Sequence, residues 1–213
     1  MHTYVKLLEK VSHQYSPSKQ LSFGIGHIFK ALQLAKLKGH ISRDLLGSEL
    51  SLGGGSIKTL VKHLKATDMI KTSNAGTILS EKGERIISQI LLHIPKETAI
   101  PQSTITVGKF NYAVLVKDTA NSIRSGIEQR DIAIKSGATG ATTLLFKDGK
   151  FIVPKTNFDA LAYELNMQKI LMENLQPDDN DVIIIGSDNT SKQNAELAAK
   201  NAALFTVMNH LKH

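Results

Sequence analysis

Three consecutive glycines, Gly53–Gly55, separate two stretches whose apolar residues recur at helical spacing. Ser42 precedes the first stretch, Arg43–Leu50, at the position of a helix N-cap. Two helices joined by a tight turn that contains glycine are typical of a helix-turn-helix. The apolar stripe of the second helix consists of Ile57, Leu60, Val61 and Leu64.

The flanking segments complete a small domain. A helical stripe of apolar residues ends at Gly39, and Ser80 is placed to cap a helix downstream of a hairpin. The order helix, helix, turn, helix, hairpin, helix is that of a winged helix-turn-helix domain, which we expect over residues 1–94. The predicted segments are 25–35 and 81–92 for the outer helices, and 69–73 and 77–79 for the hairpin strands around Asn74-Ala75-Gly76.

The second half alternates strands and helices, so the fold class we expect is α/β (α+β). Asp148-Gly149 is a two-residue hairpin signal, and the element order contains the split β-α-β unit of ferredoxin-like sandwiches. A more parallel sheet is the alternative. This second domain would span residues 103–213, after a proline-containing linker at 94–102. The predicted strands are 112–116, 141–146, 151–153 and 182–185, and the predicted helices are 120–136, 158–175 and 191–211.

Positive charge is concentrated in the first half. Residues 1–99 carry 14 Lys and Arg against 7 Asp and Glu, whereas residues 100–213 carry 12 of each. The first half therefore holds the whole formal net charge of +7. A basic module joined to a neutral one is typical of nucleic-acid binding, because phosphate contact is largely electrostatic.

The second helix of the helix-turn-helix exposes its polar side chains if its apolar stripe is buried. The major groove of DNA admits one helix, whose outer side chains reach base edges and phosphates. Lys58 and Lys62 lie one turn apart, which suits phosphate or guanine contact. The predicted DNA-binding residues are Ser56, Lys58, Thr59, Lys62, His63 and Lys65 on this helix, Arg43 on the preceding helix, and Lys71, Ser73 and Asn74 on the hairpin.

Two plainer interpretations of this surface stay open. Lysines also keep an ordinary surface helix soluble. Winged helices also serve as protein-docking modules. A P-loop does not fit the glycine run, because Ile57 rather than Gly precedes Lys58.

Charged residues in the second half suggest a polar ligand site. In the predicted helix over 120–136, Arg124, Glu128, Asp131 and Lys135 share one face, where they would pair with one another, line a pocket or contact a second subunit. Gly126 in mid-helix favours close approach by another group. Residues after the last strand would either bind a ligand or act as ordinary helix caps. The candidate ligand-binding residues are Arg124, Glu128, Asp131, Asp188 and Asn189.

Composition excludes several kinds of site. The 213 residues include no Cys, which removes disulfides, thiolate metal sites and cysteine nucleophiles. Motifs such as Gly-x-Ser-x-Gly and His-Glu-x-x-His are absent. The apolar runs fall far short of the ~20 residues of a membrane span. We expect a cytoplasmic protein without cofactor or metal and, leaving open an activity of the second domain, not an enzyme.

Three runs of sequence resemble one archaeal family. They are RSGIEQRDIAIKSGATGATTLLFKDG (124–149), LGGGSIKTLVKHL (52–64) and DDNDVIIIGSD (178–188). Members of that family pair an N-terminal winged-helix domain with a C-terminal domain of unknown function, and are described as transcriptional regulators. The resemblance implies DNA binding through the first domain and no known ligand for the second.

The predicted function is a DNA-binding transcriptional regulator that reads duplex DNA with its winged helix. We expect a homodimer, because two half-sites multiply the specificity of one short recognition helix. The second domain would dimerise the protein or sense a small-molecule effector. The alternative is a small-molecule-binding protein or enzyme whose winged helix is a docking or regulatory module.

Overall fold

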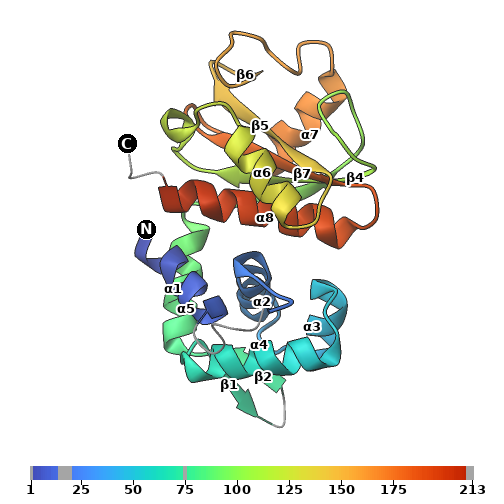
Figure 1. The fold of residues 1–213 in the computed structure, drawn as a ribbon. Helices are drawn as coiled ribbons and strands as arrows, with labels where there is room; N and C mark the ends of the chain where they lie inside the picture. Colours follow the sequence, from blue (N-terminus) through green and yellow to red (C-terminus); the bar gives the residue numbers. More distant parts are fainter. Residues whose placement is uncertain (1, 14–20, 74–75, 210–213) are drawn as a thin grey trace. The chain divides into compact units, whose positions relative to one another are not determined.

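The computed structural model describes residues 2–13, 21–73 and 76–209, and the chain divides into two compact units between Ile90 and Leu91 (Figure 1). The first unit is helical with one hairpin, and the second is built on a five-stranded sheet. Each unit buries its own apolar residues. The fold class is therefore the mixed α and β class that the sequence predicts.

The first unit has the element order of a winged helix-turn-helix. Strands β1 and β2 pair antiparallel, and Ile41 adds an isolated bridge to Thr77. The predicted caps are present, because Leu45 N–H donates to Ser42 Oγ at 3.1 Å and Gly83 N–H donates to Ser80 Oγ at 3.0 Å. Its elements are α1 (His2–His13), α2 (Ile25–Lys38), α3 (Arg43–Leu50), α4 (Gly54–Ala66), β1 (Ile70–Ser73), β2 (Gly76–Leu79) and α5 (Glu81–Leu91).

Helix α1 is an addition that the predicted element order lacks. Its residues Val5, Leu8 and Val11 recur every three positions and are buried. Three apolar residues at this spacing form a narrow apolar stripe. Such a stripe is sufficient to stabilise a helix that packs against a core formed by other elements. The buried residues of the other helices include Ile28, Phe29, Leu32, Ile57, Leu60, Leu64, Ile86, Ile87 and Ile90.

His27, near the start of α2, is held neutral by its surroundings. Its Nδ1 accepts a hydrogen bond from Gly24 N–H at 3.2 Å. Burial lowers the pKa of His27 from 6.5 to about 4, and the charge of Lys30 lowers it as well. The unfolded chain therefore binds more protons than the folded chain between about pH 6.5 and pH 4.

We expect this difference to make the first unit sensitive to acid. The stabilisation from neutral His27 is complete above pH 6.5 and is lost as the pH falls toward 4, and the loss amounts to about 2 kcal/mol by pH 5. Urea unfolding of the full chain, followed at first-unit residues by NMR, measures it. His27→Gln is the control, and an equal loss of stability in that variant between pH 7 and pH 5 would assign the effect to other groups.

The second unit contains a sheet with strand order β3-β4-β7-β5-β6, in which every pair of neighbours is antiparallel. Helices α6 and α8 pack on one face of this sheet and α7 on the other (Figure 1). Ile183 and Ile185 of the central strand lie in one core with Leu171 of α7. The elements are β3 (Glu97–Ile100), β4 (Phe110–Val116), the 3-10 turn η1 (Ala120–Ser122), α6 (Ile127–Lys135), β5 (Gly140–Lys147), β6 (Lys150–Ile152), α7 (Leu165–Leu175), β7 (Val182–Asp188) and α8 (Lys192–Asn209).

The linker interpretation of residues 94–102 is wrong. Ile94 is buried, and residues 97–100 form the edge strand β3. Lys200 of α8 is fully buried, and its Nζ lies 2.6 Å from both carboxylate oxygens of Glu97 on β3. The Tyr112 hydroxyl donates to the same carboxylate at 3.1 Å. A buried charge needs such a partner, so this pair anchors β3 to the sheet.

The ferredoxin-like alternative and the more parallel sheet are also wrong. The split β-α-β unit is present as β4-α6-β5, but the strand between β4 and β5 is β7 rather than the hairpin strand β6. Helices on both faces make three layers. The predicted helix over 158–175 begins only at Leu165, because Asp159 holds the preceding turns by accepting from Phe151 N–H and Leu161 N–H.

Candidate nucleic-acid interface and a polar pocket

Helix α4 presents a row of lysines on the side away from its core. Lys58, Lys62 and Lys65 are exposed, and they form no hydrogen bond or ion pair with the residues that the structure describes. The opposite face is buried through Ile57, Leu60 and its neighbours. The ammonium groups are therefore available to a polyanion, as the sequence predicts.

The N-terminus of α4 has no side-chain cap. Gly53 occupies the N-cap position, and Gly54 and Gly55 follow in the first turn. The first N–H groups of a helix lack intrahelical partners and carry partial positive charge. Around each of these glycines there is open space for at least 4 Å in the direction of a Cβ. The backbone is thus accessible at the end of α4 nearest Lys58.

The two hydroxyl residues of this helix are partly occupied. Ser56 Oγ lies 2.9 Å from Ser22 Oγ, and Thr59 Oγ1 donates to the Gly55 carbonyl at 3.0 Å. Both side chains are half-buried. Each hydroxyl keeps acceptor capacity, but neither is as open as the lysines.

The prediction for His63 is wrong, because its side chain belongs to the core. His63 is 3% exposed, and its Nδ1 lies 2.9 Å from the carbonyl oxygen of Val11 on α1. Its ring also packs edge-on against Phe23 with the centroids 5.7 Å apart. A ring enclosed in this way has no surface to offer to DNA.

The remaining predicted DNA-binding residues lie on two further elements. Arg43 is exposed at the first position of α3. Lys71 and Ser73 are exposed on β1, whose burial pattern is one buried residue followed by three exposed ones. Asn74 lies outside the described residues.

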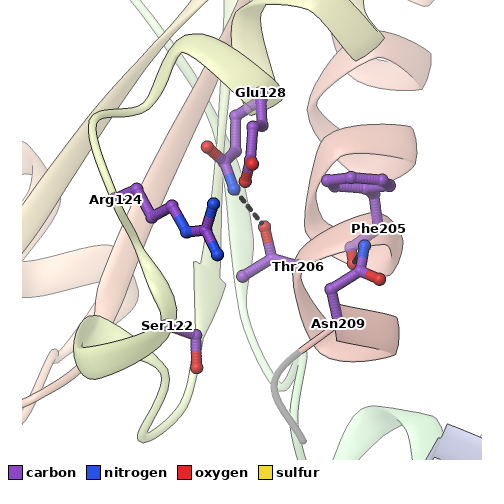
Figure 2. A pocket seen from close by; sticks show the side chains of 7 residues that line it. Ser122, Arg124, Glu128, Phe205, Thr206 and Asn209 are labelled. Atoms are coloured by element: carbon purple, nitrogen blue, oxygen red, sulfur yellow. Dashed lines mark hydrogen bonds between the residues drawn. The ribbon is translucent and has the colours of Figure 1, made fainter. Parts of the chain in front are cut away.

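A polar pocket of about 240 Å³ lies in the second unit beside α6 and the end of α8 (Figure 2). Arg124 extends from the loop before α6 toward α8, and Glu128 approaches from the first turn of α6. At the floor, Gln129 Nε2 donates to Thr206 Oγ1 at 3.0 Å, and both residues are 2% exposed. The lining residues are Ser122, Arg124, Glu128, Gln129, Phe205, Thr206 and Asn209.

The predicted helix over 120–136 is wrong in its first half. Helix α6 begins at Ile127, and Gly126 is its N-cap with φ +77°. This positive φ explains the glycine, which the sequence suggested as a mid-helix contact point. Arg124 therefore does not share a helical face with Glu128, yet the turn at Gly126 brings both side chains to one pocket.

The other three candidate ligand-binding residues lie elsewhere. Asp131 does not line the pocket and pairs with Arg130 at 3.3 Å. Asp188 is 3% exposed and caps the start of α8, since its Oδ1 accepts from Thr190 N–H and Ser191 N–H at 2.8 Å. Burial raises the pKa of Asp188, but the hydrogen bonds from Thr190 and Ser191 outweigh it and hold the pKa below its usual value. Asn189 joins two loops by accepting from Lys109 N–H and donating to Thr139 Oγ1.

Sequence reasoning missed five of the pocket residues. Phe205 and Asn209 are four residues apart on α8, and this spacing was available as a signal of one shared face. The sequence pattern did not single out Gln129. A glutamine among charged residues of a helix is expected to be exposed, whereas Gln129 is buried. The other two are Ser122 and Thr206.

Comparison with known proteins finds one matching family model in each unit. Residues 107–207 match DUF4443, a domain of unknown function. The DUF4443 match runs from just before β4 into α8 and includes every pocket residue except Asn209. Residues 25–85, which contain the helix-turn-helix and the hairpin, match the PH0730-like N-terminal domain.

One solved structure resembles most of the chain. Hypothetical protein PH0730 from Pyrococcus horikoshii OT3 matches with a TM-score of 0.69 and 25% sequence identity, over 86% of this chain and 92% of that one. No curated protein matches. The two family-model matches fit the predicted two-domain arrangement, in which the C-terminal domain is of unknown function.

The described residues contain neither a cluster of metal ligands nor a membrane-spanning helix. Among residues 2–13, 21–73 and 76–209, no group of three or more His, Asp or Glu side chains is placed to hold a metal ion. In the same part of the chain, no helix has the length and hydropathy that crossing a membrane requires.

Proposed function

We propose that the chain binds duplex DNA through α4 and the β1–β2 hairpin. The observation that carries the proposal is the row of exposed lysines on α4, the second helix of a helix-turn-helix. In this motif the second helix enters the major groove with its N-terminal residues at the base edges. Lys58 is close to that end of α4, beside the accessible glycine backbone.

The charge of the chain supports the same assignment. Residues 1–99 hold the whole formal net charge of +7. Lysines that neutralise phosphates release counterions, so binding should weaken steeply as salt rises. We propose that the protein acts in the cytoplasm as a homodimeric transcriptional regulator, because a dimer reads two half-sites.

A gel-shift titration of random duplex DNA at two salt concentrations tests DNA binding. We expect binding at 50 mM salt, and three or more phosphate contacts would weaken it by at least about 40-fold at 200 mM. Absence of binding at low salt would refute the proposal. A single-stranded competitor of equal length is the control, since a groove-reading helix should prefer duplex.

The pocket favours a second candidate function. In this alternative the second unit binds a small molecule, and the winged helix is a docking or regulatory module for that unit. Two charged and several polar side chains converge there. This candidate predicts a ligand but no affinity for duplex DNA, so the same titration separates it from the first. A protein-docking module without either activity would give a stable partner in a pull-down instead.

A further inference from the structure

We propose that the pocket lined by Arg124 and Glu128 binds a free α-amino acid with an apolar side chain. Arg124 would hold the carboxylate and Glu128 the ammonium group. This assignment goes beyond the proposed function, because it concerns the second unit and requires no DNA.

The pocket has a fixed polar floor beneath two charged side chains. Gln129 and Thr206, each 2% exposed, are joined by a 3.0 Å hydrogen bond between α6 and α8. Buried polar groups that bond to each other hold their positions and orient a ligand above them. Figure 2 shows Arg124 reaching from the loop toward α8 while Glu128 comes from α6.

The charges of the lining select a ligand with one charge of each sign. Arg124 is the cationic and Glu128 the anionic side chain of the pocket. The Glu128 carboxylate forms no hydrogen bond or ion pair with the residues that the structure describes, so it is available to an ammonium group. A guanidinium binds a carboxylate in a two-point fork. A phosphate monoester with two negative charges would leave one uncompensated beside Glu128.

The volume and the lining of the pocket restrict the class of ligand further. Pockets for drug-sized ligands span roughly 300–1,000 Å³, and this one measures about 240 Å³. A single amino acid suits that volume better than a nucleotide. Phe205 supplies an apolar ring on the α8 side, which would contact the ligand side chain, and Asn209 supplies an amide one turn further along α8.

The test is an NMR titration of the ¹⁵N-labelled full chain, without DNA, with each of the twenty common amino acids at up to about 10 mM. We expect saturable shifts at residues 122–129 and 205–209 with at least one apolar amino acid, for example L-leucine. For leucine, 3-methylbutylamine lacks the carboxylate and 4-methylpentanoate lacks the ammonium group. Each corresponding analogue should bind at least tenfold more weakly than its parent amino acid.

Single substitutions test whether binding depends on the charges of Arg124 and Glu128 rather than on the stability of the fold. Arg124→Gln and Glu128→Gln should each weaken amino acid binding at least tenfold. Arg130→Gln and Asp131→Asn, which lie on α6 like Glu128 but outside the lining, should leave it unchanged. Three results would overturn the proposal: no saturable shift with any amino acid, equal binding of a singly charged analogue, or tighter binding of AMP at these residues. Because DNA is absent, the outcome is independent of whether the winged helix binds DNA.

Discussion

Replacing Lys58 and Lys62 together by alanine is expected to weaken binding to duplex DNA about 60-fold per protomer at 0.1 M salt. Each lysine that contacts a phosphate contributes about 0.9 to the slope of log affinity against log salt, so the slope should become shallower by about 1.8. Both side chains are exposed and form no hydrogen bond or ion pair with any described residue. The free energy of unfolding should therefore change by less than about 0.5 kcal/mol.

The control must remove the same charge from another surface. Lys147 and Lys150 face each other across the β5–β6 hairpin and are both exposed, so their double alanine variant has the same net charge as the α4 variant. Fluorescence anisotropy at several salt concentrations compares the two. Equal slopes in both variants would mean that binding follows overall charge rather than α4, and the assignment of α4 as the recognition helix would then fail.

The winged helix-turn-helix was predictable because its signals are local. Ser42 and Ser80 cap helices through hydrogen bonds to residues three positions away, and the lysine row follows from the apolar stripe of the same helix. Such contacts depend only on nearby sequence. His63 was beyond this reasoning, because its burial comes from α1, fifty-two residues upstream.

The second unit was less predictable because its topology rests on pairing over long distances. Four of the five strands were predicted and β3 was missed, but the order of the strands was not predictable: β7 inserts between β4 and β5 although seventy residues or so separate it from β4. The sequence pattern predicts which face of each strand is buried, but it does not predict which strands lie next to it in the sheet. The linker interpretation failed for the same reason, since Glu97 is anchored by Lys200, more than a hundred residues away.

The polar pocket was predicted in part. Arg124 and Glu128 were chosen for a shared helical face that does not exist, since Gly126 starts the helix with a positive φ. The two residues line one pocket through a turn, so they lie close together for a geometric reason other than the predicted one. Asp188, by contrast, follows the ordinary capping interpretation that the sequence also offered.

The tight packing of β7 against α8 predicts a large effect of one methyl group. At Gly186 a Cβ would lie 2.2 Å from the carbonyl oxygen of Ala195 and 2.6 Å from the backbone nitrogen of Ala199. Neither backbone atom moves without shifting the whole helix or the central strand. Gly186→Ala should therefore destabilise the second unit by about 3 kcal/mol or more, at the upper end of what overpacking costs.

The same substitution at Gly55 is the matched control. Gly55 lies in α4 with open space in the direction of a Cβ, and alanine is a better helix former than glycine by up to about 1 kcal/mol. Urea unfolding followed by NMR at residues of each unit should find the first unit unchanged or stabilised in Gly55→Ala and the second unit strongly destabilised in Gly186→Ala. A loss below about 1 kcal/mol in Gly186→Ala would mean that α8 is free to move away from β7, and that the floor formed by Thr206 on α8 and Gln129 on α6 is adjustable rather than fixed.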